Sequence, residues 1–103
     1  MDILNNVQQT SLVSVVMPAY NAEKTIAGAV LSLKSQTYSN WELIIVDDKS
    51  TDATIEVVEK LSQLDSRIRL IKRTENSGGC RIPRFEAVWA ALGDYICYLD
   101  ADD

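Results

Sequence analysis

The sequence predicts an α/β fold in which a mainly parallel sheet of about four strands carries helices on both faces. Two observations lead to this prediction. Short, continuous apolar segments alternate along the chain with longer segments whose apolar residues recur at helical spacing. Strands that are apolar along their whole length are typical of parallel sheets, because helices cover both of their faces. With 103 residues, the chain is long enough for one such domain and not for two.

The first predicted strand is the β-branched run Val13–Met17, which ends at Pro18. The apolar residues that follow recur at i, i+4 and i+7 and mark one face of a helix: Ile26, Val30 and Leu33. Asn21 precedes this helix, and its side chain can cap the free N–H groups of the first helical turn. The chain therefore begins with a strand, a polar loop and a helix.

The second predicted strand covers Glu42–Val46, and a polar turn, Asp47–Asp52, follows it. The next helix is marked by an apolar stripe: Ile55, Val58, Leu61 and Leu64. A third, shorter strand is predicted at Ile68–Ile71, before a loop at Asn76–Gly79. This second unit repeats the strand-helix order of the first.

The third predicted helix has an apolar face of four residues: Phe85, Val88, Trp89 and Leu92. Pro83 is acceptable in the first turn, where its missing N–H has no helical partner. We expect Gly93 to end this helix and Tyr95–Leu99 to form the fourth strand. We predict that residues 13–103 form the domain, after a polar N-terminal extension at residues 1–12.

Composition narrows the classes of function. The net charge of −5 argues against a nucleic acid polymer as partner, since such binding needs a basic face. Cys80 and Cys97 are expected to be free thiols in a reducing compartment. The chain has no histidine, which excludes Ser-His and Cys-His nucleophile pairs within it. No signal peptide or spanning segment is evident, so we expect a cytoplasmic protein, with membrane association only through other regions.

Polar residues follow three of the four predicted strands: Pro18–Asn21 after the first, Asp47 and Asp48 after the second, and Asp100–Asp103 after the fourth. Parallel strands bring their carboxyl ends to one edge of the sheet, where ligands bind. Taken singly, these segments have plainer explanations as a helix cap, a polar turn and a solvated tail. Together they favour a site, because clustered carboxylates need a cation or a polar ligand to offset their repulsion.

The pattern D-x-D-D after the last strand suits a divalent cation. Carboxylates separated by one residue can converge on Mg²⁺ or Mn²⁺, which prefer oxygen ligands. Mg²⁺ typically takes one or two protein carboxylates and completes its shell with water and phosphate oxygens. A nucleoside diphosphate would supply those oxygens, and the metal would then stabilise the departing diphosphate as a Lewis acid.

Five segments closely resemble family 2 glycosyltransferases of the GT-A fold, in order and in spacing: Val15–Asn21, Gln36–Tyr38, Trp41–Asp48, Ser50–Asp52 and Tyr98–Asp103. The resemblance runs from about Ser14 to the last residue. It implies that residues 13–103 are the Rossmann-like, nucleotide-sugar-binding part of a GT-A domain. It also implies transfer of a sugar from a nucleoside-diphosphate sugar, with Mg²⁺ or Mn²⁺, as in polysaccharide biosynthesis.

The resemblance further implies roles for residues near the nucleoside. Pro18, Ala19 and Tyr20 would border the nucleobase and the ribose. Asp48 would accept a hydrogen bond from the base, which is commonly uracil in this family. Asp47 would support the loop that carries Asp48.

At the diphosphate, the resemblance implies that Arg84 lies near the donor phosphates. Asp100 would face the ribose or the metal shell, and Asp102 would be the direct metal ligand, with Asp103 beside it. All three aspartates are therefore candidate metal residues.

Two departures from the family pattern bear on these roles. Lys49 replaces the usual glycine of the D-D-G-S turn and predicts a reshaped turn, since glycine is permissive at positive φ. Phe85 stands where asparagine commonly follows the arginine, so Arg81 is an alternative to Arg84. A further alternative is that both arginines only balance nearby carboxylates.

The resemblance also implies an acceptor-binding half after the D-x-D motif, which carries the base in inverting members. No residue of this chain can be assigned as that base. We therefore expect the chain alone to bind donor without completing transfer. The acceptor class, whether carbohydrate, lipid-linked or protein, is not specified.

Three other classes of function are alternatives to sugar transfer. A non-catalytic nucleotide-binding module can share this fold, because fold does not fix function. An Mg²⁺-dependent phosphohydrolase or receiver-like domain needs a phosphorylatable aspartate and a supporting lysine in a different strand order. A dinucleotide oxidoreductase is disfavoured because no G-x-G-x-x-G follows any strand.

Overall fold

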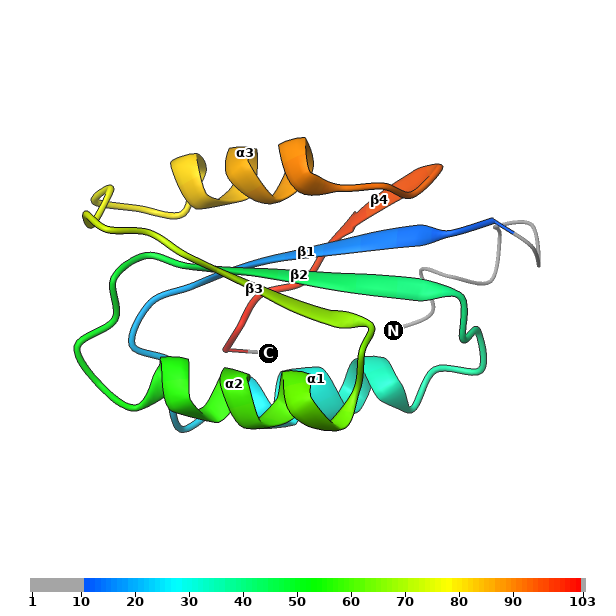
Figure 1. Cartoon of the computed structure of the whole chain (residues 1–103), viewed down its shortest axis with the longest axis horizontal. Coiled ribbons are helices and arrows are strands. Elements are labelled where there is room, and N and C mark those ends of the chain that lie inside the picture. The colour runs from blue at the N-terminus through cyan, green and yellow to red at the C-terminus, as the bar shows by residue number, and fades with distance from the viewer. Residues whose placement is uncertain (1–10, 103) are drawn as a thin grey trace.

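The computed structural model describes residues 11–102 and confirms the predicted fold class. Four parallel strands form one sheet in the order β3-β2-β1-β4, with helices on both faces (Figure 1). The elements follow one another along the chain as β1 (Val13–Ala19), α1 (Ile26–Lys34), β2 (Trp41–Asp47), α2 (Thr54–Leu64), β3 (Ile68–Lys72), α3 (Arg81–Ala90) and β4 (Tyr95–Tyr98). Within this part of the chain, none of the helices combines the length and apolar character that crossing a membrane requires.

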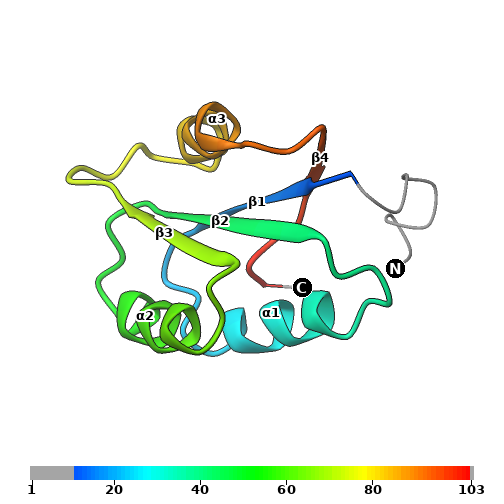
Figure 2. The same ribbon diagram turned by 45° about the vertical axis from the view of Figure 1, so that its right-hand side comes forward.

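The two central strands, β1 and β2, explain the continuous apolar runs of the sequence. Helices α1 and α2 lie side by side on one face of the sheet, and α3 covers the other (Figures 1 and 2). Alternate residues along the strands point to opposite faces, so each face needs its own apolar set. Val15, Met17 and Leu43 belong to the larger core cluster that includes α1, whereas Val16 and Ile44 pack with Ala87 of α3.

Strand β1 extends two residues beyond its predicted end, through Pro18 to Ala19. The last pair between β1 and β4 is Val16 with Tyr98, after which Leu99 N–H still donates to the Val16 carbonyl at 3.0 Å. On this side of β1, Pro18 lies beyond the paired residues. Its missing N–H therefore breaks no hydrogen bond of the ladder, which is the position in which a strand tolerates proline.

The predicted apolar face of the third helix is wrong for three of its four residues, and only Val88 packs against the core. Pro83 and Ala87 are the buried residues of α3, whereas Phe85 and Trp89 are 59% and 86% exposed. Leu92 lies beyond the helix and is also exposed. Helical spacing identified the helix correctly, but it could not show which stripe faces the sheet, because a stripe of smaller residues runs along the opposite side.

A buried carboxylate fastens the connection between α3 and β4 to the sheet. Glu42 Oε2 accepts hydrogen bonds from Ser14 Oγ at 2.6 Å and from Leu92 N–H at 2.7 Å. Gly93 N–H donates to Ser14 Oγ at 2.8 Å, and Arg69 lies 3.1 Å from Glu42 Oε1. The predicted helix-ending glycine serves this close approach instead, since a Cβ on Gly93 would lie 2.6 Å from the Ser14 hydroxyl oxygen.

We expect Glu42→Ala to lower the free energy of unfolding by about 3 kcal/mol, because it leaves buried donors and a guanidinium without their partner. Urea denaturation followed by circular dichroism measures the change. Glu59→Ala is the matched control, since Glu59 pairs with Lys72 at 3.4 Å on the surface and both side chains are about half exposed. The control should cost about 0.5 kcal/mol or less. Equal losses in the two variants would contradict the assigned role of Glu42.

Candidate functional site

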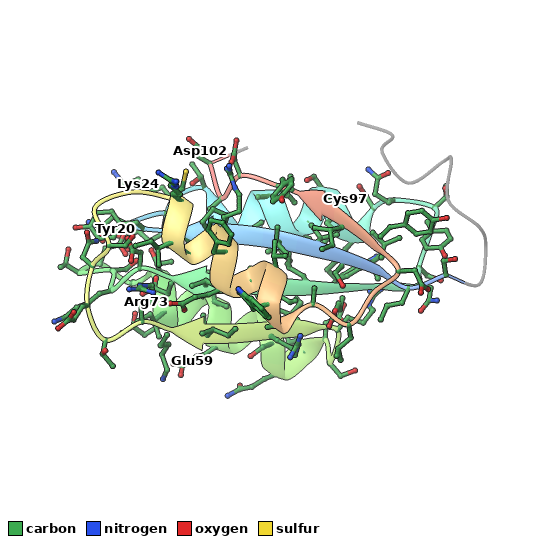
Figure 3. All side chains as sticks on the ribbon, turned by 90° about the horizontal axis from the view of Figure 1, so that it is seen from above. Tyr20, Lys24, Glu59, Arg73, Cys97 and Asp102 are labelled. Carbon is green, nitrogen blue, oxygen red and sulfur yellow. The ribbon has the colours of Figure 1, made fainter. Side chains whose placement is uncertain are left out.

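Two adjoining cavities lie at the carboxyl ends of the strands. The first, the Asp48 cavity, measures about 300 Å³, and its lining includes Ala19, Asp48, Asn76 and Gly78. The second, the Asp102 cavity, measures about 440 Å³, and its lining includes Asn21, Thr25, Asp100 and Asp102. Three residues line both cavities and join them: Pro18, Tyr20 and Cys80. Figure 3 shows Tyr20 and Asp102 toward the same end of the molecule.

Asp48 is a buried carboxylate, 3% exposed, at the wall of the first cavity. Its Oδ1 accepts a hydrogen bond from Ser77 N–H at 2.9 Å and lies 3.1 Å from Arg73 Nε. Its Oδ2 accepts from Ser77 Oγ at 2.8 Å, and Asn76 Nδ2 donates to the Asp48 carbonyl at 2.8 Å. The segment after β3 therefore folds around Asp48 and supplies the polar partners that its burial requires.

Asp47 lines neither cavity and holds the turn that follows β2. It is fully buried and accepts hydrogen bonds from Ser50 N–H at 2.9 Å and from Ser50 Oγ at 2.5 Å. Between them, Lys49 has φ 61°, in the left-handed region where glycine is without strain. The turn thus has a conformation suited to glycine even though it carries lysine.

The predicted helix cap at Asn21 is wrong. Helix α1 begins at Ile26, after Thr25, whose side chain makes no capping hydrogen bond. Asn21 has φ 50°, a left-handed conformation that asparagine tolerates, and its Oδ1 accepts from Thr51 N–H at 2.8 Å. Asn21 therefore ties the loop after β1 to the loop after β2.

Asp52 completes this link between the two loops. Its Oδ1 accepts from Thr54 N–H at 2.9 Å and its Oδ2 from Glu23 N–H at 3.3 Å. Burial acts to raise the pKa of Asp52, but the hydrogen bonds from Thr54 and Glu23 outweigh it and hold the pKa below its usual value. Since the charged form is favoured by folding, Asp52 helps to hold the loops together above the acid range.

The acidic segment after β4 supplies carboxylates to the second cavity. Asp100 and Asp102 are both exposed and line the Asp102 cavity, whereas Asp103, the third predicted metal residue, lies outside the described residues. Two solvated carboxylates facing a polar cavity suit Mg²⁺ or Mn²⁺, which complete their shell with water and phosphate oxygens. Over residues 11–102, no three carboxylate or thiol side chains gather closely enough to hold an ion.

Arg84 lies in a third cavity, of about 330 Å³, whose lining includes Cys80, Arg81 and Tyr98. Its guanidinium carbon is 5.1 Å from the centroid of the Tyr98 ring, and it lines neither of the other two cavities. Neither Arg81 nor Arg84 forms an ion pair with another described residue. Cys80 lines all three cavities and connects them.

The sequence predicted that six residues lie at the carboxyl edge of the sheet, and in the structure they line the two cavities there: Pro18, Ala19, Tyr20, Asp48, Asp100 and Asp102. It missed Arg73, Asn76 and Ser77, which surround Asp48. Asn76 and Ser77 were identified only as loop residues. The useful signal was the strand order, because β3 lies next to β2 and so brings the segment after β3 beside the end of β2.

Solved structures share this fold. The chain superposes on S. aureus TarS 1-349 in complex with UDP-GlcNAc with a TM-score of 0.82 and 36% identity, covering 87% of this chain and 26% of that one. It superposes equally well, with a TM-score of 0.82, on the mannosyltransferase PcManGT from Pyrobaculum calidifontis in complex with GDP-Man and Mn²⁺. That pair is 27% identical over 92% of this chain and 29% of the other.

Proteins of related sequence are also glycosyltransferases by name. The chain is 42% identical to the putative teichuronic acid biosynthesis glycosyltransferase TuaG of Bacillus subtilis, over 89% of this chain and 36% of that protein. It is 46% identical to the UDP-Glc:alpha-D-GlcNAc-diphosphoundecaprenol beta-1,3-glucosyltransferase WfgD of Escherichia coli, over 89% of this chain and 35% of that protein. The chain therefore spans about a third of the length of these relatives.

The family described as Glycosyl transferase family 2 matches residues 14–103, which is nearly the whole chain. This range begins at the second residue of β1 and contains every strand-end residue of the two cavities. The resemblance noted in the sequence is confirmed, and the chain belongs to glycosyl transferase family 2.

Proposed function

We propose that this chain binds the donor of a glycosyltransferase, a nucleoside-diphosphate sugar whose base is uracil, and that the protein transfers the sugar to an acceptor. The observation that carries the proposal is the pair of joined cavities. One holds a buried carboxylate whose two oxygens each accept a hydrogen bond from Ser77, and the other holds two exposed carboxylates. This order matches a base at one end of the donor and a diphosphate with its cation at the other.

The Asp48 cavity suits a nucleobase. Tyr20 and Pro18 give it an aromatic and an apolar wall, and Tyr20 is half exposed and free to pack on a base or a ribose. Asp48 supplies a hydrogen-bond acceptor for a ring N–H. Ala19 at the end of β1 leaves room beside Asp48, because its side chain is a single methyl group. Pockets of this kind combine apolar walls with few, fixed polar groups.

The Asp102 cavity suits the diphosphate. Asp102 and Asp100 would hold Mg²⁺ or Mn²⁺, with Asp103 as a further candidate. When bound, the cation offsets the charge that develops on the departing nucleoside diphosphate. Arg84 is the candidate for a direct phosphate contact, from the neighbouring cavity that also reaches Cys80.

The relatives support the choice of donor. TarS was solved with UDP-GlcNAc, and the name of WfgD specifies UDP-Glc as its donor. PcManGT was solved with Mn²⁺, which supports a divalent cation. The names of TuaG and WfgD refer to teichuronic acid and to a lipid-linked diphosphate, so we place the reaction in polysaccharide assembly. We assign no catalytic base within this chain and expect it to bind donor without completing transfer by itself.

We expect UDP to bind in the presence of Mn²⁺ with clear preference over ADP, because Asp48 offers an acceptor to the ring N–H of uracil, whereas adenine presents a ring nitrogen that is itself an acceptor. Isothermal titration calorimetry measures both affinities. Asp48→Asn should weaken UDP binding by about tenfold or more, as expected for losing one hydrogen bond to a charged group. Asp94→Asn, an exposed change that lines neither cavity, should leave it unchanged. A preference for ADP, or no binding of either nucleotide, would refute the proposal.

We expect Asp102→Asn to weaken the Mn²⁺-dependent part of UDP binding by about tenfold or more, since affinity for a hard cation depends on the number of charged ligands. Asp47→Asn should leave the dependence on Mn²⁺ largely intact, because Asp47 bonds Ser50 and lines neither cavity. Mn²⁺ titrations at fixed UDP separate the two effects. Equal losses of metal dependence would remove Asp102 as the metal ligand.

A further inference from the structure

We propose that Ser77 makes the site selective for uracil over cytosine by holding the carboxylate of Asp48 in one orientation. The inference rests on the proposed nucleotide-binding function and extends it to a residue outside the donor cavities. Ser77 lines neither the Asp48 cavity nor the Asp102 cavity, although its neighbours Asn76 and Gly78 both line the first. Ser77 is therefore a positioning residue, which acts on the base only through Asp48.

Both carboxylate oxygens of Asp48 are bonded to this one residue. Ser77 N–H donates to Oδ1 at 2.9 Å, and the Ser77 hydroxyl donates to Oδ2 at 2.8 Å. The hydroxyl also lies 2.7 Å from the Gly79 carbonyl, but its single proton favours the charged acceptor. A carboxylate turns easily about its bond to Cβ when nothing holds it. Two bonds from one residue to its two oxygens fix the plane of the group.

Arg73 adds charge to this arrangement but no hydrogen bond to the carboxylate. Its Nε lies 3.1 Å from Asp48 Oδ1, yet the single Nε proton is donated to the Glu75 carbonyl, at 3.2 Å. The ion pair therefore attracts the carboxylate without setting the direction of its lone pairs. Within the described part of the chain, the hydrogen bonds that orient the carboxylate are those from Ser77.

The loop around Ser77 is itself held in place. Asn76 Nδ2 donates to the Asp48 carbonyl at 2.8 Å, and Asn76 Oδ1 accepts from Gly78 N–H at 2.8 Å. Gly78 has φ 85°, a left-handed conformation that suits glycine. The turn on either side of Ser77 thus fixes its two donors before any ligand arrives, and an acceptor that is fixed in advance costs less to order on binding.

A fixed acceptor separates two bases that the cavity walls cannot. Uracil and cytosine have nearly the same size and shape, so the apolar contact with Pro18 and Tyr20 does not tell them apart. They differ at ring N3, where uracil carries a proton and cytosine a lone pair. Ser77 uses one acceptor position on each oxygen of Asp48 and leaves one on each for a ligand.

The orientation of Asp48 therefore decides what cytosine meets. Under the proposed function, a carboxylate held toward N3 accepts the proton of uracil and repels the lone pair of cytosine. A carboxylate that is free to turn can instead accept from the amino group that cytosine carries beside N3. Selectivity of this kind depends on the penalty imposed on the wrong ligand, and the contacts from Ser77 maintain that penalty.

Calorimetric affinities for UDP and CDP with Mn²⁺, in the protein at its natural length, test this role. The unaltered protein should prefer UDP. Ser77→Ala should narrow the ratio of the two affinities by about tenfold, the scale of one hydrogen bond to a charged group. Ser77→Thr keeps the hydroxyl and should retain most of the preference. Ser62→Ala is the matched control, since its hydroxyl donates to the Glu59 carbonyl at 2.9 Å on α2, and it should leave the ratio unchanged.

The outcomes separate this inference from the proposed function. If Ser77→Ala changes the affinities for UDP and CDP by the same factor, or changes neither, the inference is wrong while the proposed function stands. If the unaltered protein binds neither nucleotide, both fail. If circular dichroism shows that Ser77→Ala does not fold, Ser77→Cys decides, because a thiol of similar size is only a weak donor. A narrowed ratio in Ser77→Cys supports the inference, and an unchanged ratio overturns it.

Discussion

The burial of two adjacent carboxylates at the end of β2 governs the arrangement of the site. Asp47 is the last residue of β2, which is buried along its whole length, and Asp48 follows it, so water cannot solvate either carboxylate freely. A buried charge needs polar partners, and here they come from the chain on both sides: Ser50 for Asp47, and Arg73 with Ser77 for Asp48. The loops after β2 and β3 fold toward these carboxylates and supply the partners. In doing so they form part of the wall of the Asp48 cavity.

Helix α3 depends on the same strand at both of its ends. Its buried apolar contact is small, because only Pro83 and Ala87 are its buried residues. At its end, Glu42 at the start of β2 accepts from Leu92 N–H, and Arg69 donates to the Ala90 carbonyl at 2.6 Å. Before its start, Asp48 holds the preceding loop, and the Arg73–Glu86 pair holds the middle of the helix itself. Polar contacts from β2, β3 and the residues that follow them therefore fix a helix that apolar packing alone would hold weakly.

Sequence reasoning recovered what depends on local pattern and on parallel topology. Continuous apolar runs identified the strands, and their shared edge located Asp48 and Asp102 in adjoining cavities. It failed where the outcome depends on long-range partners. Asn21 looked like a helix cap, but it bonds Thr51, 30 residues away. Phe85 and Trp89 looked like core, but the helix turns its smaller residues to the sheet. Nothing in the local pattern around Arg73 indicated that it faces Asp48.

Apolar packing and polar contacts act on different parts of the molecule. Apolar contacts within the sheet fix where the strand ends lie, and structures with different donors share that frame at a TM-score of 0.82. Asp48 is instead held by polar contacts from Arg73, Asn76 and Ser77, which follow β3. Under the proposed function, a change in Ser77 would alter how Asp48 is presented to a base while β1 and β2 stay in place. Proteins of this family can therefore share the apolar core of β1 and β2 and still differ in the polar contacts at the end of β2.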